Sequence, residues 1–270
     1  MKTKTLTLVT VISAMLAVSL NAAAVTVVND DFSDGTIAKS SSLTLDYYSS
    51  NSSNAGILQD ATLNPVSPNN VLRVNADRTA IAPLGQTLTL ASVDSITLSF
   101  SYRYTSVSTI PALRIGLLND GGTAVSSNDL TPTTDDYGIY ATIGTAAVQG
   151  VVETGTNGNI FAGTDRTYGT ATGYTMDTAA HQVVATYSLS GSTYSMAVSI
   201  DGVSYGSVSS TALTNFNPNE LAIVTLTNTV EISNILITTT SSIPESSTYS
   251  LIAGAAALGL ASFCNRRRRG

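Results

Sequence analysis

Residues 95–104 read SITLSFSYRY, and this stretch decides the fold. Apolar side chains occupy every second position from Ile96 to Tyr104, and Thr, Ser or Arg stands between them. This alternation places one set of side chains on each face of a β-strand, whereas a helix would scatter them around its circumference. The stretch therefore predicts a strand with one buried and one exposed face.

The same pattern returns in two further stretches of the chain. Leu113, Ile115 and Leu117 alternate before an Asn-Asp-Gly-Gly turn, and residues 193–200 read TYSMAVSI before Asp201-Gly202. Asp-Gly favours a two-residue hairpin, because both turn positions take positive φ. No window longer than ten residues between 25 and 242 has a convincing helical period, so short strands and frequent turns indicate an antiparallel β-sandwich, or jelly roll.

The composition argues against several classes of function. Charged residues make up 11% of the 270, and the sequence has no Trp, a single His and a single Cys. One His and one Cys cannot build a Cys/His metal site or a Cys/His hydrolase. Half of the Lys and Arg lie near the two ends, while every Asp and Glu except Glu245 lies between them. This acidic middle has no basic stripe, which argues against nucleic-acid binding.

The N-terminus has the three parts of a secretory signal peptide. Lys2 and Lys4 precede the apolar run 6–20, and residues 22–24 are three alanines that form a cleavage pattern. A membrane anchor is the alternative, but the run is short for a span of about 20 residues. We expect residues 1–24 to form a signal helix that signal peptidase removes.

The C-terminus also has three parts. Pro244 and Glu245 precede the apolar segment 250–263, which we expect to be a short helix. The chain then ends in a cluster formed by Arg266, Arg267, Arg268 and Arg269. The positive-inside rule would keep these arginines cytoplasmic and leave residues 25–242 outside. A plain C-terminal anchor is the alternative, although 14 residues rich in Ala and Gly make a marginal span.

This tail resembles the PEP-CTERM sorting signal of bacterial exported proteins, which a membrane protease called exosortase recognises. The motif, apolar helix and Arg cluster occur in the same order over residues 241–270, with Ser246 in place of the second proline of the motif. The resemblance implies exosortase as a partner and transient anchoring in the inner membrane of a Gram-negative-type bacterium. It also implies delivery to the cell surface or extracellular matrix, with residues 25–240 left as one β-sandwich domain.

Short motifs in this domain resemble the concanavalin A-like, laminin-G-like jelly roll. His181-Gln182-Val183 matches the start of one of its strands, and the next strand ends at Asp201-Gly202. Residues 30–35 resemble the opening segment of the family, and residues 231–237 resemble its closing strand, which lies beside the first. A generic β-sandwich is the alternative.

A structural calcium is the cofactor that this resemblance suggests. Many jelly-roll modules hold one Ca²⁺ with oxygens from their first and last strands, and Asp30, Asp31 and Asp34 supply such ligands here. Ser233 stands where several relatives have a ligating Asp. Another loop site would use Asn119, Asp120, Asn128 and Asp129, although Asp/Asn/Gly runs are usually turns.

We do not expect the domain to be an enzyme. Glu153, Glu220 and Glu231 are isolated from other acids, and the neighbours Asp135 and Asp136 would point to opposite faces of a strand. Glycosidases need two facing carboxylates. Lyases of similar fold need clustered Arg, His and Tyr, which the sequence does not indicate.

Two tyrosines are the candidates for ligand contact. Aromatic platforms stack on sugar rings, and Tyr168 and Tyr174 lie in and next to the Gly/Thr-rich stretch 163–173, an expected exposed loop. Packing within the loop is the alternative for both. The unique His181 is expected to begin a strand and to hydrogen-bond a neighbouring loop.

The sequence therefore indicates an exported, non-catalytic β-sandwich of the cell envelope or extracellular matrix. It would bind an extracellular polysaccharide or serve a structural role. The alternative is a divergent glycan-active enzyme, either a glycosidase or a polysaccharide lyase of jelly-roll fold.

Overall fold

The structure, a computed structural model, describes residues 23–49, 54–107, 112–126, 136–144, 147–155 and 165–241. Residues 24–239 form one compact unit. The apolar runs of the two expected targeting segments lie outside the described residues, as do Pro244, Glu245 and the Arg cluster 266–269. Within the described ranges, no helix is long and apolar enough to cross a membrane.

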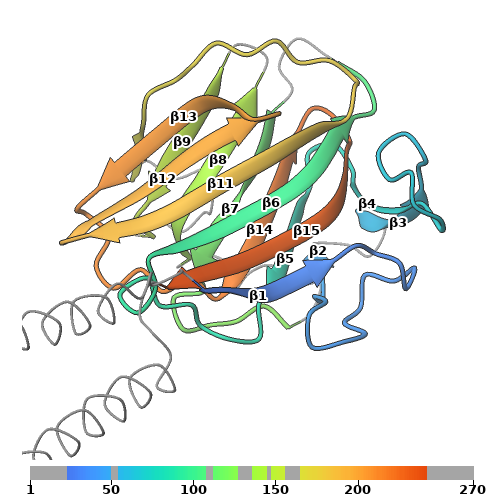
Figure 1. The fold of residues 1–270 in the computed structure, drawn as a ribbon. Coiled ribbons are helices and arrows are strands. Elements are labelled where there is room, and N and C mark those ends of the chain that lie inside the picture. The colour runs from blue at the N-terminus through green and yellow to red at the C-terminus, as the bar shows by residue number, and fades with distance from the viewer. Residues whose placement is uncertain are drawn as a thin grey trace, which may run out of the picture. The chain divides into compact units, whose positions relative to one another are not determined.

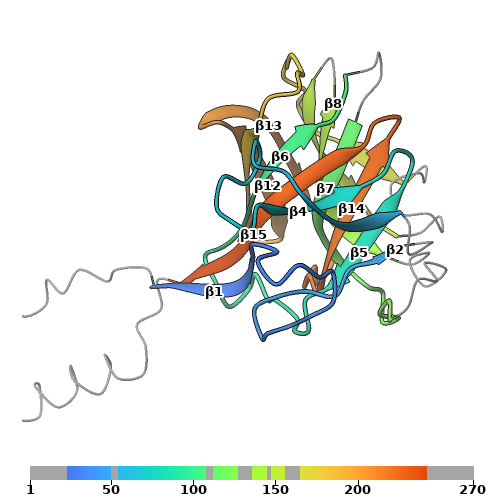
Figure 2. The same ribbon diagram turned by 90° about the vertical axis from the view of Figure 1, so that its right-hand side faces the viewer.

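The described strands form two antiparallel sheets that pack face to face (Figures 1 and 2). Sheet A has the order β13-β12-β11-β6-β15-β4-β3, with β1 also paired to β15, and sheet B has the order β10-β9-β8-β7-β14-β5-β2. The strands of sheet A are β1 (Ala23–Asp30), β3 (Ala55–Gln59), β4 (Asn70–Val74), β6 (Ser95–Tyr104), β11 (His181–Ser190), β12 (Thr193–Ile200), β13 (Val203–Ser210) and β15 (Val230–Ser241). Those of sheet B are β2 (Tyr48–Ser49), β5 (Thr79–Pro83), β7 (Ala112–Asn119), β8 (Tyr137–Gly144), β9 (Val148–Glu153), β10 (Arg166–Tyr168) and β14 (Glu220–Leu226).

The expected all-β antiparallel sandwich is confirmed. The stretch 95–104 is strand β6, and its side chains alternate between buried and half-buried along the whole strand. Asp201 and Gly202 take φ values of 52° and 77°, and they join β12 to β13 as the predicted tight hairpin. The closing strand β15 pairs with β1, as the resemblance to the jelly roll implies.

Buried tyrosines connect the two sheets through the core. Tyr104 of β6 donates its hydroxyl to the carbonyl of Ile143 in β8 at 3.0 Å, and Tyr187 of β11 accepts the N–H of Leu117 in β7 at 3.2 Å. Burial raises the pKa of both tyrosines, so both stay neutral. Because a buried hydroxyl without a partner is costly, these contacts make the inter-sheet packing specific as well as apolar.

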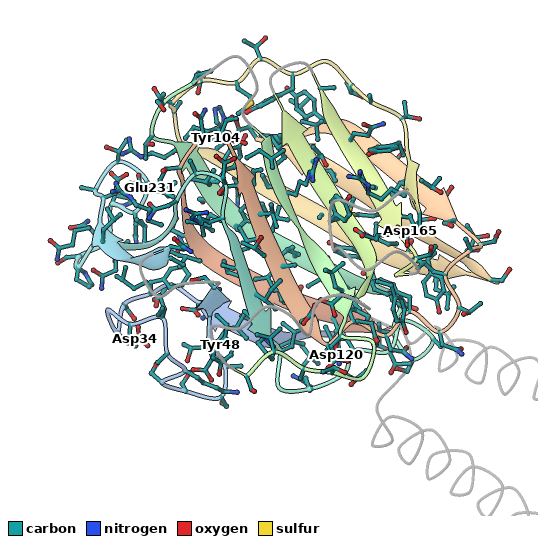
Figure 3. All side chains as sticks on the ribbon, turned by 180° about the vertical axis from the view of Figure 1, so that it is seen from behind. Asp34, Tyr48, Tyr104, Asp120, Asp165 and Glu231 are labelled. Atoms are coloured by element: carbon teal, nitrogen blue, oxygen red, sulfur yellow. The ribbon has the colours of Figure 1, made fainter. Side chains whose placement is uncertain are left out.

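A buried carboxylate holds three strands of sheet A together on its outer face. Glu231 of β15 (labelled in Figure 3) has no exposed side-chain surface and lies 2.5 Å from Nη2 of Arg73 in β4 and 2.7 Å from Nε of Arg103 in β6. Arg103 Nε also lies 2.5 Å from Asp60, just after β3. Two acids and two guanidinium groups thus neutralise one another across β3, β4, β15 and β6.

Replacing Glu231 by Gln is expected to lower the free energy of unfolding by about 2 kcal/mol, because two arginines lose the charge that compensates them. Urea denaturation followed by circular dichroism measures the change. The matched control is Asp31→Asn, in an exposed turn where Asn caps equally well, and it should leave stability unchanged. Equal losses in both variants would contradict a special role for Glu231.

Candidate functional site

The outer face of sheet A over β6, β11, β12 and β13 is coated with small hydroxyl side chains. Thr97, Thr186, Ala197 and Ser207 lie opposite one another in one row across these four strands. Ser188, Ser195 and Ser209 form the next row across β11, β12 and β13. The inward positions of the same strands are buried and apolar, so period-two alternation leaves Ser and Thr facing outward.

Two shallow depressions adjoin on this face. One is lined by Thr186, Ser188, Ser195, Ala197, Ser207 and Ser209, and also by Met196 and Val208. The other is lined by Tyr168, Gly169, Thr170, Ser207, Val208 and Ser209. Because Ser207, Val208 and Ser209 belong to both, the two form one continuous surface with Tyr168 at its edge. We call Tyr168, Thr186, Ser188, Ser195, Ser207 and Ser209 the hydroxyl surface.

A seam between the two sheets brings Tyr168 to this surface. Tyr168 ends β10, the edge strand of sheet B, and the N–H of Thr170 then donates to the carbonyl of Ser207 in β13, the edge of sheet A, at 3.0 Å. Gly169 lies at the crossing, where a Cβ atom would collide with the Ser207 carbonyl and with Val208. Glycine is required there because the two backbones approach so closely.

The stretch 163–173, expected as an exposed loop, is therefore partly a strand. Arg166, Thr167 and Tyr168 pair with Glu153, Val152 and Val151 of β9. The strand could not be predicted from the sequence, because β10 has three residues, too few for a periodic pattern, and because Gly and Thr surround it. Asp165, labelled in Figure 3, immediately precedes it.

Tyr168 keeps an exposed ring that is held in place from one side. The residue is 54% exposed, and the guanidinium carbon of Arg166 lies 5.7 Å from its ring centroid. Burial lowers the pKa of Arg166, but the hydrogen bond to the Tyr140 hydroxyl and the nearby charge of Glu153 together raise it above its usual value, so the cation is permanent. A cation over the ring restrains its orientation while leaving ring surface for contact.

Tyr174, the other candidate, lies in different surroundings. Its ring packs edge-on against Tyr205 at 5.1 Å between centroids, and its hydroxyl lies 3.0 Å from that of Tyr102. The residue is half-buried against the main core. Tyr174 is thus arranged for packing, and ligand contact by it stays a prediction.

The proposed calcium ligands Asp30, Asp31 and Asp34 serve separate backbone turns. Asp31 accepts the N–H of Ser33 at 2.9 Å, and Asp34, labelled in Figure 3, accepts the N–H of Thr36 at 3.1 Å. Asp30 is 2% exposed, and its carboxylate accepts the N–H of Phe32, the N–H of Leu45 and the hydroxyl of Tyr47. Burial raises the pKa of Asp30, although these backbone hydrogen bonds lower it in part.

These three residues do not fit a calcium site. Asp30 uses both carboxylate oxygens, and Asp31 and Asp34 one each, for hydrogen bonds within the chain. Among the described residues, no group of three or more His, Cys, Asp or Glu is arranged to hold a metal ion. In the alternative loop, Asp120 accepts the N–H of Gly122 in a turn, while Asn128 and Asp129 lie outside the described residues.

The outer face of sheet B carries a second, buried polar cluster that the sequence did not indicate. Tyr140 is fully buried, and burial followed by the charge of Glu153 raises its pKa to about 12. Arg166 and Glu153 lie opposite each other at the edge of the same face. No sequence pattern revealed this cluster, because its residues come from three strands, β8, β9 and β10, and the outer positions of these strands also include apolar, buried Val151.

Two of the acids considered for catalysis lie on this face. Glu153 and Glu220 occupy one row across the sheet, with Gly138 and Leu118 between them. Three strand spacings separate their backbones by about 14 Å, whereas paired glycosidase carboxyl groups lie about 5–9.5 Å apart. Glu231 lies in the sheet A cluster described above, Asp136 is buried just before β8, and Asp135 is outside the described residues.

Comparisons with known proteins identify no family. No protein-family model matches the chain, and no curated protein matches its sequence. Similar solved structures include the binding domain of botulinum neurotoxin DC, with a TM-score of 0.49 and 13% identity over 78% of this chain. The chain spans about half, 47%, of that neurotoxin chain.

Other similar structures include a lectin and an enzyme. Peanut lectin has a TM-score of 0.45 and 12% identity, covering 81% of this chain and 97% of the lectin. An endo-β-1,4-glucuronan lyase from Trichoderma reesei has a TM-score of 0.40 and 8% identity, covering 70% of this chain and 89% of the lyase. At such scores and identities, these likenesses carry no argument about ligand or activity.

The Asp30 hydrogen bonds predict a stability effect that is independent of calcium. Asp30→Ala should lower the free energy of unfolding by about 2–3 kcal/mol, because the Leu45 N–H and the Tyr47 hydroxyl lose a buried acceptor. Thermal melts of the parent and the variant, each with calcium and with EDTA, measure it. Asp34→Ala is the exposed-turn control and should cost less than about 1 kcal/mol. If EDTA lowers the melting temperature of the parent but not that of Asp30→Ala, Asp30 belongs to a metal site instead.

Proposed function

We propose that this protein binds neutral polysaccharide chains at the hydroxyl surface and does not cut them. The observation that carries the proposal is a continuous surface of Ser and Thr hydroxyls with the exposed residue Tyr168 at its edge. An aromatic ring stacks on the apolar face of a sugar, and hydroxyl groups both donate to and accept from sugar hydroxyls. A shallow surface suits an extended chain that is contacted along its length.

The charge of the protein supports a neutral ligand over an acidic one. The residues that line the two depressions include no charged side chain. The chain has a net charge of −6 even though it counts the basic residues of both ends. Such a surface repels anionic polymers at low salt. Uronic-acid or sulfated chains are therefore expected to bind weakly.

A non-catalytic role is part of the proposal. The wide separation of Glu153 and Glu220 on sheet B supports it, because neither acid has the other within the distance that glycoside hydrolysis uses. The alternative, a divergent glycosidase or lyase, would place its chemistry on that face and would release new sugar ends.

Export completes the proposal and rests on the sequence of the two ends. Signal peptidase would act near residue 24, and exosortase would recognise Pro244, Glu245 and the Arg cluster 266–269 while the apolar helix crosses the inner membrane. The sandwich would then act at the cell surface or in the extracellular matrix, where neutral polysaccharide is at hand. A structural role in that matrix is compatible with the same surface.

Retention on immobilised polysaccharides tests the proposed function. The 270-residue chain, held in mild detergent, should be retained by neutral glucans or mannans more than by alginate or heparin, with no new reducing or unsaturated ends released. Tyr168→Ala should weaken retention about tenfold, the value of one lost stacking contact. Tyr168→Phe keeps the ring and is the matched control, which should bind as the parent does. Unchanged binding by Tyr168→Ala, absence of any retention, or release of sugar ends would each overturn the proposal.

A further inference from the structure

The single histidine of the chain lies between two carboxylates. His181 begins β11, and its side chain is 14% exposed. Its Nδ1 lies 2.7 Å from Oδ2 of Asp201, and its Nε2 lies 2.8 Å from Oδ1 of Asp177. An ionised carboxylate only accepts hydrogen bonds, so both ring nitrogens must carry protons for both contacts to form. The geometry is that of a charged imidazolium.

Each carboxylate is itself oriented by the backbone. Asp177 accepts the N–H of Ala179 at 2.7 Å through the same Oδ1 that faces the imidazole. Asp201 uses its second oxygen, Oδ1, to accept the N–H of Gln182 at 2.8 Å. The first bond lies within the connection itself, whereas the second joins Asp201 of the turn to β11. Neither bond needs a charged His181, so the imidazole is the variable member of the group.

The two acids belong to separate parts of the chain. Asp177 lies in the connection 169–180 between β10 of sheet B and β11 of sheet A, and Asp201 lies in the tight turn between β12 and β13. The connection has other anchors as well: Met176 is buried in the main core, and the Tyr174 hydroxyl bonds that of Tyr102. Thr170 pairs with Ser207, Thr172 pairs with Val148, and Tyr174 packs on Tyr205.

Tyrosines complete the surroundings of the imidazole. Its ring centroid lies 5.7 Å from that of Tyr102 in β6 and 6.0 Å from that of Tyr174 in the connection. Among the described residues, the titratable groups that face His181 are therefore Asp177, Asp201, Tyr102 and Tyr174. Burial raises the pKa of both tyrosines, so neither changes charge between pH 4 and 8.

We propose that protonated His181 is a pH-sensitive latch that holds the connection 169–180 onto the β12–β13 turn and releases it as the pH rises. A neutral imidazole has one N–H and can donate to only one of the two carboxylates. Loss of the proton therefore breaks one contact. Asp177 is the acid that leaves, because it lies on the connection. Asp201, in the hairpin turn, stays bound to the N–H of Gln182 in β11.

The pH window follows from the direction of each shift. Burial lowers the pKa of His181, but its hydrogen bonds with Asp201 and Asp177 outweigh burial and raise it. A raised histidine pKa contributes stability that is complete below about pH 6.5 and is lost as the pH rises through the folded-state value.

The two acids set the lower limit of the window. The hydrogen bond with His181 lowers the pKa of Asp177. Burial raises the pKa of Asp201, but its contact with His181 and the Gln182 N–H lower it overall. Their contribution is present above about 3.9 and is lost as the pH falls through the lowered values, so the latch is closed from about pH 4 to pH 6.5.

The connection that the latch holds begins beside the hydroxyl surface, but the latch does not depend on what that surface binds. The connection starts directly after Tyr168 and includes Thr170, whose N–H closes the seam with Ser207. Opening the connection would loosen the edge that positions Tyr168. The inference thus goes beyond glycan binding and can be tested in the absence of any ligand.

Proton NMR of the imidazole measures the first requirement directly, because the chain has a single histidine. In the 270-residue chain in mild detergent, the His181 ring signal should titrate with a pKa above 6.5. Asp177→Asn should lower that pKa by removing one of the two charges. A pKa at or below 6.5 in the parent chain, or one that Asp177→Asn leaves unchanged, would overturn the latch.

Hydrogen exchange read by mass spectrometry measures the release. After correction for intrinsic rates, exchange in the connection 169–180 should rise on the order of fivefold between pH 5.5 and pH 8. This is the change expected when one exposed charge-assisted contact of about 1 kcal/mol is lost. Exchange in β7 and β14 should not change. His181→Gln cannot titrate and should show the same exchange at both pH values.

Tyr174→Phe is the matched control for the latch. It removes the hydroxyl contact with Tyr102 but keeps both carboxylate contacts of His181, so its exchange should retain the pH dependence. Equal protection of the connection at both pH values in the parent, or a pH dependence that survives in His181→Gln, would refute the proposal. Both results are independent of polysaccharide retention.

Discussion

Packing between the inward faces of the two sheets is the constraint on which the rest of the structure depends. The inward positions of β6, β11 and β12 are apolar or aromatic, and they meet those of β7, β8 and β14 in one cluster. The hydroxyls of Tyr104 and Tyr187 add specific contacts to the backbone of the opposite sheet. Because these contacts leave little freedom in how the sheets are aligned, every outward-facing residue is placed by the same packing.

The two outer faces then differ in kind. Sheet B presents a mainly buried face on which Tyr140 and Val151 pack with Ile81 and Leu118. Sheet A presents small hydroxyl groups over β11, β12 and β13 and the Glu231 charge cluster over β4, β15 and β6. The seam at Gly169 joins the edges of the two sheets, so that an aromatic residue of sheet B borders the hydroxyl face of sheet A.

Charged groups are few in this protein, and two of the arrangements they form join distant parts of the chain. Arg73 and Glu231 are 158 residues apart in sequence, yet they lie opposite each other on β4 and β15. His181 shows the same principle on a smaller scale, since the hairpin turn brings Asp201 to an imidazole 20 residues away. In a chain with 11% charged residues, these contacts join specific segments to one another and are not part of a charged surface that extends over the whole domain.

The sequence alone determined the features that depend on local side-chain direction. Alternation in 95–104 specified β6 and its buried face, and Asp201-Gly202 specified a hairpin, because backbone geometry decides both within a few residues. Tyr168 was recognisable as a candidate from local composition, because it is an aromatic residue among Gly and Thr. The tertiary structure alone decided which outward residues share a surface, why Tyr174 packs while Tyr168 is exposed, and that Asp30 serves Leu45 and Tyr47. Those outcomes depend on strand order and register between segments far apart in the chain, and no local pattern of residues encodes them.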